Sequence, residues 1–323
     1  DHLTALVERD ENSFTLQAEK SQYSALPDTL CTAAAADLIR LRQLAEWNCA
    51  EALKFLVQVY KNTIDSESAV LLKEESKAFI KQEPSSSFFY SAESLAERIH
   101  KSGAGVLGQA VSFLWEKNET TSCLQPIRCP DHICLDDLSR YEEQRSVLIS
   151  NTKRFLDARP ANNILLYGDR GTGKSASVKA VCNSFASRGL RLVEVRKKDL
   201  LYFSELLDLL SKRACFFVIF IDDLSFEKTD DSFTGLKALL EGGAERRPDN
   251  VVVYATSNRR HLVKERFQDR PDTAQAAAAA SSGDVRAFDS MQEQLSLADR
   301  FGITVVFSAP SQEEYLTIAE FLA

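Results

Sequence analysis

The sequence predicts a parallel α/β domain, with helices on both faces of the sheet, that follows a mostly helical N-terminal domain. After residue 163, five apolar runs of strand length alternate with helix-patterned segments. Each run is continuously apolar, as strands that are covered on both faces of a sheet require. This alternation is typical of a doubly wound parallel sheet. The runs are NILLYG (163–168), LRLVEV (190–195), FFVIFID (216–222), VVVYATS (251–257) and ITVVFS (303–308).

Residues 1–120 are predicted to form the separate helical domain, whose role the sequence does not assign. The segment 33–62 has apolar residues three and four positions apart and contains no glycine or proline. The segment 94–118 has a similar pattern and is predicted to form two helices, which are separated by glycines. Trp47 and Trp115 lie in these predicted helices, where we expect both to be core side chains.

Composition and charge limit the class of protein. Of the 323 residues, 44% are hydrophobic and 27% are charged, which is typical of a globular protein. No apolar run reaches the roughly 18 residues that a membrane-spanning helix needs. The first residues, DHLTALVERDENSF, lack the basic start and apolar stretch of a secretory signal. We therefore expect a cytoplasmic protein without a membrane partner.

The seven cysteines are scattered along the chain and odd in number, which favours reduced thiols over a disulfide framework. Cys123, Cys129, His132 and Cys134 are close enough in sequence to be weighed as a zinc site. The paired Cys-x-x-Cys spacing is absent, however, and a free cysteine often behaves as a small buried apolar residue. We therefore do not expect a zinc site.

A glycine-rich turn follows the first predicted strand and opens a helix. It matches the pattern G-x-x-x-x-G-K-[ST], in which backbone N–H groups and the start of a helix surround phosphate groups. Lys174 is expected to contact the β- and γ-phosphate oxygens of a nucleoside triphosphate, and Ser175 to ligate Mg²⁺. The eight predicted binding residues are Gly168, Asp169, Arg170, Gly171, Thr172, Gly173, Lys174 and Ser175.

Polar side chains also flank three of the later strands. Asp222 is expected to hold Mg²⁺ through water beside Ser175, and Asp223 to orient or deprotonate an attacking water. Asn258 follows the next strand, where its amide could position that water. Arg300 precedes the last strand and could reach the γ-phosphate of a neighbouring subunit. The alternatives are helix-capping acids and, for the arginine, a surface ion pair.

These elements, in this order, resemble the AAA+ ATPases of the P-loop superfamily over residues 121–323. The glycine-rich loop resembles Walker A, Phe217–Asp223 resembles Walker B, Asn258 resembles sensor 1, and Arg300 in DRFG resembles the arginine finger. More narrowly, four phrases are similar to a bacterial AAA+ family catalogued as a domain of unknown function. The phrases are PANNILLYGDRGTGKSASVKA, IDDLSFE, YATSNRRHL and LSLADRFG.

The resemblance implies an αβα sandwich with a parallel five-stranded sheet in the order 5-1-4-3-2. It also implies ATP with Mg²⁺ as cofactors and a homo-oligomeric ring or filament with active sites at subunit junctions. With the helical domain at 1–120, residues 121–160 become a connector and lead-in helix, 161–310 the nucleotide-binding domain, and 311–323 the start of a helical lid. We interpret the chain as a fragment with a truncated lid, so no sensor 2 residue is assigned.

One departure from the family pattern concerns catalysis, because Asp223 stands where most AAA+ members have Glu. The shorter side chain favours slow turnover, and the Asp-Asp pair is similar to that of replication-initiator ATPases, which act as ATP switches. The main hypothesis is an ATPase that assembles or remodels a macromolecular client. The alternative is a nucleotide-gated switch or DNA-loading scaffold with slow or negligible hydrolysis.

The sequence does not identify the client molecule. A remodelling ATPase could grip a polypeptide or a single strand of nucleic acid through Lys197, Lys198 and Tyr202, which follow the second strand. A solvated charged turn is the alternative for this segment. A DNA-loading protein would instead use the basic run at 259–266. The net charge of −8 opposes this, so nucleic acid is not the favoured partner.

Overall fold

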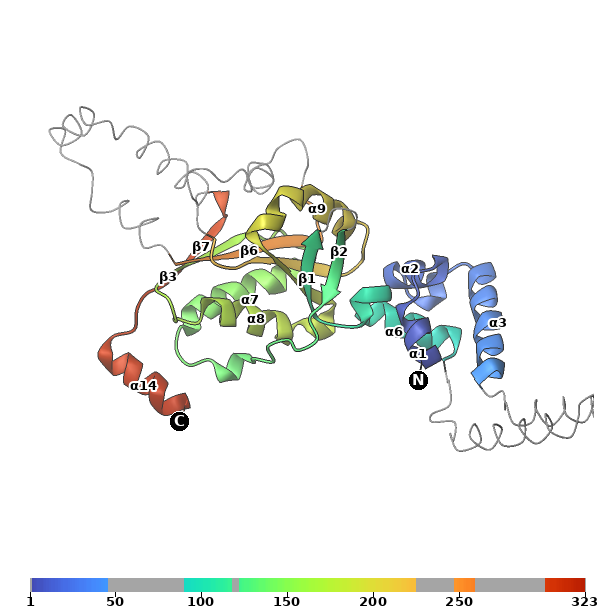
Figure 1. The fold of residues 1–323 in the computed structure, drawn as a ribbon, viewed down its shortest axis with the longest axis horizontal. Coiled ribbons are helices and arrows are strands. Elements are labelled where there is room, and N and C mark those ends of the chain that lie inside the picture. The colour runs from blue at the N-terminus through green and yellow to red at the C-terminus, as the bar shows by residue number, and fades with distance from the viewer. Residues whose placement is uncertain (1, 46–89, 118–121, 225–246, 259–299, 323) are drawn as a thin grey trace, which may run out of the picture. The chain divides into compact units, whose positions relative to one another are not determined.

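The computed structural model describes residues 2–45, 90–117, 122–224, 247–258 and 300–322 (Figure 1). The chain divides into two compact units, residues 1–100 and residues 101–323, and each is described by itself. The boundary predicted near residue 120 therefore falls inside the second unit. No helix in the described parts of the chain is long and apolar enough to span a membrane.

The first unit is helical in its described residues. Asn12 caps the second helix, because its side chain accepts the N–H groups of Phe14 and Thr15 while the Thr15 hydroxyl accepts the N–H of Asn12. Beyond residue 45, the helix predicted over 33–62 lies outside the described residues. The helices are α1 (His2–Arg9), α2 (Ser13–Lys20), the 3₁₀ turn η1 (Tyr23–Ala25), α3 (Asp28–Ala45) and α6 (Ala92–Ser102), of which the last ends at the start of the second unit.

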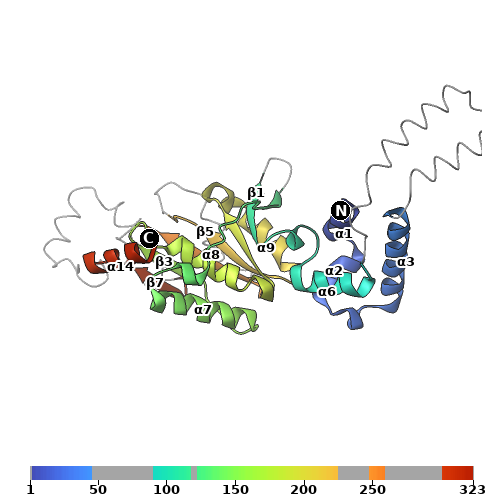
Figure 2. The same ribbon diagram turned by 90° about the horizontal axis from the view of Figure 1, so that it is seen from below.

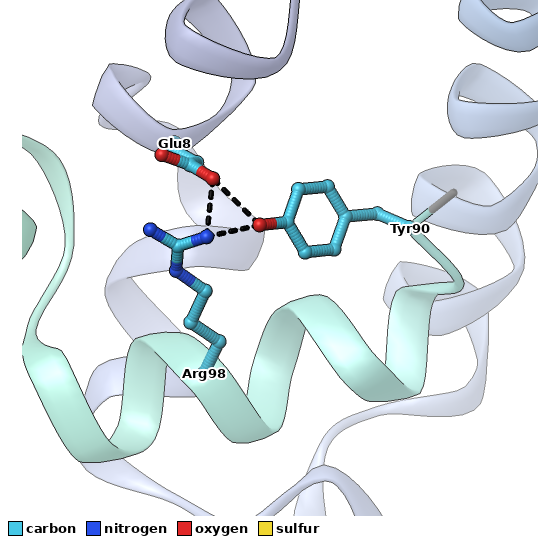
Figure 3. Close-up of polar contacts among 3 residues, drawn as sticks. All are labelled: Glu8, Tyr90 and Arg98. Atoms are coloured by element: carbon cyan, nitrogen blue, oxygen red, sulfur yellow. Dashed lines mark hydrogen bonds and ion pairs between the residues drawn. The ribbon is translucent and has the colours of Figure 1, made fainter. Parts of the chain in front are cut away.

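Three polar side chains connect α1 with α6 and with the residue two positions before it (Figure 3). The Tyr90 hydroxyl donates to Glu8 Oε1 at 2.6 Å, and the Arg98 guanidinium contacts both the Glu8 carboxylate and the Tyr90 hydroxyl. Burial, together with the hydrogen bond to Glu8, raises the pKa of Tyr90. These contacts join α1 and α6 within the unit, and the carboxylate and the guanidinium neutralise each other.

A seven-stranded sheet forms the centre of the second unit, with the strand order β2-β1-β4-β5-β6-β3-β7. All neighbouring strands are parallel except β1 and β2, which are antiparallel. The strands are β1 (Ser112–Lys117), β2 (Ser122–Pro126), β3 (Ile164–Gly168), β4 (Leu190–Val195), β5 (Phe216–Ile221), β6 (Val251–Ser257) and β7 (Ile303–Phe307).

Helices cover both faces of this sheet, as the sequence predicts (Figure 1 and Figure 2). On one face, Phe203 and Leu206 of α9 pack in a buried cluster with the strands; on the other face, α7 and α8 supply Leu148, Phe155 and Val181 to a second cluster. The helices of this unit are α7 (Glu142–Leu156), α8 (Lys174–Ser184), α9 (Phe203–Ser211) and α14 (Gln312–Leu322), with short 3₁₀ turns η2 (Gly105–Gly108), η3 (Leu135–Asp137), η4 (Ala186–Arg188) and η5 (Lys197–Tyr202).

The prediction of a five-stranded sheet is wrong, because β1 and β2 add two strands beside β4. The other five strands, numbered among themselves along the chain, keep the predicted order 5-1-4-3-2 from β7 to β4. The sequence predicts a helix where β1 lies and a connector where β2 lies. Trp115 therefore lies on a strand, although it is fully buried as expected. Apolar residues in so short a segment fit either period, and pairing with β4 decides in favour of the strand.

Candidate phosphate-binding site

The glycine-rich loop lies between β3 and α8, at the carboxyl edge of the sheet. Gly171 and Gly173 have φ values of 75° and 81°, a backbone conformation that glycine adopts without strain. Gly168 has a φ of 144°, and a Cβ at this position would lie 1.9 Å from the carbonyl oxygen of Phe307 on β7. Only glycine therefore fits at the start of the loop, because the backbone of β7 passes directly against it.

Lys174 is the first residue of α8 and points back into the loop. Its Nζ donates to the carbonyl oxygens of Gly168 at 3.1 Å and of Asp169 at 2.7 Å. Burial lowers its pKa, while the carboxylates of Asp169, Asp222 and Asp223 act in the opposite direction. An ammonium group that is held by neutral carbonyls can exchange them for phosphate oxygens, to which charged hydrogen bonds are stronger.

Asp169 and Thr172 hold the loop in shape. The Thr172 hydroxyl donates to the carbonyl oxygen of Asp169 at 2.8 Å. The Asp169 backbone N–H donates to Phe307 on β7, and its carboxylate accepts the N–H of Ala309 at 2.9 Å. The loop is thus tied to the chain that leaves β7. Arg170, by contrast, is exposed.

Ser175 and Asp222 meet at the carboxyl edge of the sheet, where the sequence places them. The Ser175 hydroxyl donates to Asp222 Oδ1 at 2.7 Å, and the Thr256 hydroxyl donates to the same oxygen at 2.6 Å. A hydroxyl and a carboxylate are oxygen ligands of the kind that Mg²⁺ takes, with water and phosphate completing its shell. Among the described residues, no group of three His, Cys, Asp or Glu side chains could hold a metal ion. Ser175 and Asp222 therefore fit only a Mg²⁺ ion that water and phosphate oxygens also ligate.

Asp223 and Asn258 are the second pair that the fold brings together. Asn258 Nδ2 donates to Asp223 Oδ1 at 2.8 Å. Asp223 has a φ of 52°, in the left-handed region that non-glycine residues seldom adopt. Its backbone N–H donates to Thr256 Oγ1 at 2.9 Å, and the next N–H, of Leu224, donates to the Thr256 carbonyl oxygen at 2.7 Å. The end of β6 therefore fixes the turn that follows β5.

Thr256 is not among the residues that the sequence predicts for this site. A signal for it exists in the strand period, because alternate residues of a strand point to the same face. Thr256 lies on β6 two positions before Asn258, which directly follows the strand, so the strand period predicts the same side of the sheet for both. Its hydroxyl is almost fully buried, since Thr256 is 1% exposed.

The remaining predicted residues lie apart from this group or outside the described chain. Arg300 is exposed and comes just before β7. Lys197, Lys198 and Tyr202 form the turn η5, which leads directly into α9, and the ring of Tyr202 lies 4.9 Å from the Lys117 ammonium. The basic run at 259–266 lies outside the described residues.

The glycine-rich loop and the helix that begins at its lysine define a P-loop fold, and five of the seven strands have the order that the resemblance to AAA+ proteins implies. The chain belongs to the family described as "Protein of unknown function (DUF815)", which matches residues 108–323. No curated protein matches the chain. A similar solved structure is described as "Crystal Structure of the DnaI"; the two share 19% identity over 57% of this chain and 93% of that chain, with a TM-score of 0.35.

Proposed function

We propose that this chain is an ATP-binding AAA+ ATPase that hydrolyses ATP to ADP and phosphate with Mg²⁺. The observation that carries the proposal is the hydrogen-bonded row beside the glycine-rich loop, in which Ser175 contacts Asp222 and Asn258 contacts Asp223. The row brings a hydroxyl, two carboxylates and an amide to the edge of the sheet where the loop begins α8. These are the groups that phosphoryl transfer to water requires near the phosphates.

Phosphate binding is assigned to the residues of the loop, Gly168–Ser175. Its backbone N–H groups and the start of α8 form the positive surface, and Lys174 supplies the full charge. Ser175 gives its hydroxyl hydrogen to Asp222, which leaves its oxygen lone pairs free for a cation. Mg²⁺, when bound, supplies charge that offsets the negative phosphate oxygens. Asp222 Oδ1 already accepts two hydrogens, so its second oxygen remains for the shell of the metal.

Water activation is assigned to Asp223 and Asn258. The Asn258 amide fixes one oxygen of Asp223, so the other oxygen can accept a proton from an attacking water. Asp223 has one methylene fewer than Glu, which places its carboxylate closer to its own backbone. This favours slow turnover and supports, as the second candidate function, a nucleotide-gated switch or DNA-loading scaffold.

The assembly that we propose is a cytoplasmic homo-oligomer, a ring or filament, that acts on a macromolecular client. Arg300 supports this part of the proposal, because an exposed arginine beside an edge strand can extend toward a second copy of the chain. In a neighbouring site it would offset the charge that develops on the γ-phosphate. The client of the oligomer is a protein or another macromolecule, and nucleic acid is not favoured.

The test is the rate of ATP hydrolysis against protein concentration for the wild type and for Asp223→Ala, with ATP binding measured on the same samples. We expect Asp223→Ala to bind ATP like the wild type and to lose about 100-fold or more in turnover, the usual contribution of a general base. Asp208→Ala, on the exposed side of α9, is the matched control and should leave both quantities unchanged.

Concentration dependence separates the two candidate functions. Turnover per chain that rises with protein concentration, and a flat profile for Arg300→Ala, would support an oligomer with sites at subunit junctions. Tight Mg²⁺-dependent ATP binding without turnover in either protein would favour the switch. Equal turnover by the wild type and Asp223→Ala would refute the assignment of the water-activating residue.

A further inference from the structure

The hydroxyl group of Thr256 lies between the two acidic residues of the site. Its hydrogen goes to Asp222 Oδ1 at 2.6 Å, and its oxygen accepts the backbone N–H of Asp223 at 2.9 Å. Asp222 and Asp223 are assigned different tasks, one toward the metal and one toward water. A single buried side chain on β6 thus contacts both residues that follow β5.

The hydrogen-bond chemistry of a hydroxyl group makes this contact directional. A threonine hydroxyl has one hydrogen and two lone pairs. Because the amide of Asp223 can only donate and the Asp222 carboxylate accepts, the hydroxyl hydrogen is fixed toward Asp222. The oxygen atom is fixed by the same pair of bonds, and the whole group is buried, with Thr256 only 1% exposed.

Asp223 depends on this contact because its backbone is in a sparsely populated conformation. A φ of 52° at a residue with a Cβ persists only where neighbouring groups hold it. Thr256 supplies two such groups, its hydroxyl for the N–H of Asp223 and its carbonyl for the N–H of Leu224. The direction of the Asp223 side chain toward Asn258 follows from this backbone conformation.

Asp222 depends on the contact for the direction of its carboxylate. Among the described residues, Ser175 and Thr256 are its two donors, and both bond to Oδ1. The bond from Ser175 is exposed, and Ser175 is itself assigned to the metal. Thr256 is the buried donor, because it lies on β6 and is 1% exposed.

We propose that Thr256 is the positioning residue of this site, and that its hydroxyl couples the metal-side acid, Asp222, to the water-side acid, Asp223. This proposal rests on the proposed function, because the proposed function assigns Asp222 to Mg²⁺ and Asp223 to water. Within the described part of the chain, loss of the hydroxyl leaves Asp222 with one donor and the Asp223 N–H without its acceptor. Both the Mg²⁺ dependence of ATP binding and the rate of turnover then decline together.

Two substitutions separate the hydroxyl from the shape of the side chain. Thr256→Val keeps the branched shape and removes the hydroxyl, whereas Thr256→Ser keeps the hydroxyl and removes the methyl group. The readout is the ratio of ATP affinities measured with Mg²⁺ and with a chelator in its place, alongside turnover. A side chain that merely fills the core would change thermal stability in both variants without changing this ratio.

We expect Thr256→Val to reduce the affinity ratio by about tenfold, because a hydrogen bond to a charged group is lost. We expect its turnover to fall by more than this factor. Thr256→Ser should stay within about threefold of the wild type. Far-UV circular dichroism and thermal unfolding establish that each variant is folded before binding is measured.

The possible outcomes separate this inference from the function on which it rests. If Thr256→Val keeps the wild-type ratio and turnover, or if Thr256→Ser falls as far as Thr256→Val, the positioning role is wrong while the ATPase proposal stands. If the wild type binds ATP with equal affinity in Mg²⁺ and in chelator, the metal assignment fails and the role of Thr256 fails with it. If the wild type binds Mg²⁺-ATP without hydrolysis, the affinity ratio alone still decides the role.

Discussion

Two clusters of polar side chains, one in each compact unit, satisfy their charges in different ways. In the first unit, the Glu8 carboxylate lies against the Arg98 guanidinium and the Tyr90 hydroxyl (Figure 3). In the second unit, Asp222 and Asp223 receive hydrogens from hydroxyl and amide groups, which carry no charge. Neither of these two acids forms an ion pair with another part of the described chain.

The difference shows what separates a structural cluster from a candidate site. A carboxylate that faces a guanidinium has its charge neutralised by the protein itself, so it has little to offer a ligand. A carboxylate that is held by neutral donors keeps its charge and is oriented at the same time. Such a pair of acids beside a glycine-rich loop can attract a cation, and the loop can attract the phosphate that travels with it.

The largest expected effect comes from removing the charge that faces the phosphate. Lys174→Ala should weaken ATP binding by about 100-fold or more, because hydrogen bonds to charged groups contribute roughly 1.5–3 kcal/mol each. Titration of a fluorescent ATP analogue measures the affinity. Lys212→Ala is the matched control, since Lys212 is exposed and pairs with Asp208. Equal affinities for wild type and Lys174→Ala would show that the charge of Lys174 does not contribute to nucleotide binding.

A second substitution tests the backbone that supports the site. Gly168→Ala places a Cβ 1.9 Å from the Phe307 carbonyl at a φ of 144°, so we expect a loss of about 3 kcal/mol in the free energy of unfolding. Gly171→Ala meets no atom within 4 Å and should cost only about 1 kcal/mol through its φ of 75°. Urea unfolding measures both, and similar losses would mean that contact with β7 does not restrict the loop.

A double-mutant cycle on Glu8 and Arg98 tests the cluster of the first unit, which we interpret as structural. Glu8→Gln, Arg98→Met and the double variant should show a coupling free energy of about 0.5–1 kcal/mol in urea unfolding, as for other partly exposed ion pairs. ATP affinity should be unchanged in all three variants, because the pair is satisfied within its own unit. A change in ATP affinity would break the comparison and give the first cluster a functional role.

The smallest effect concerns pH. The pKa of Tyr90 is raised above its ordinary value of 10, so the folded chain holds this proton more tightly than the unfolded chain. The resulting stability is fully present below pH 10 and is lost as the pH rises through the folded pKa. Tyr90→Phe should flatten the decline of stability above pH 10, by less than about 1 kcal/mol because solvent screens this partly exposed group. Unfolding curves at a series of alkaline pH values test this.

A second tyrosine serves as the reference for that measurement. Burial raises the pKa of Tyr254 to about 12, although Thr152 and Asn151 form hydrogen bonds with its hydroxyl that act in the opposite direction. Its contribution to stability is therefore also lost above pH 10. In Tyr90→Phe we expect a smaller decline of stability above pH 10, and the part that remains is expected from Tyr254. A decline as steep as that of the wild type would show that Tyr90 does not contribute.

The sequence was sufficient to predict those parts of the site that depend on the ends of strands. Ser175 and Asp222 are far apart along the chain, yet they meet because parallel strands bring their carboxyl ends to one edge. The strand β1 was predicted as a helix because its apolar residues fit two periods, and its partner β4 comes much later in the sequence. The bonds of Thr256 could not be predicted for a related reason, since they depend on the turn that Asp223 makes after β5.

The position of β3 in the sheet has a consequence for the order in which the molecule acquires its structure. Its two neighbours, β6 and β7, both follow it by long stretches of chain. Contacts between distant segments require costly loop closure and form slowly. On the ribosome, β3 emerges long before either neighbour, and Gly168 cannot pack against Phe307 until β7 has been synthesised. The loop that carries the candidate chemistry is therefore among the last parts of the nascent chain to reach its final shape.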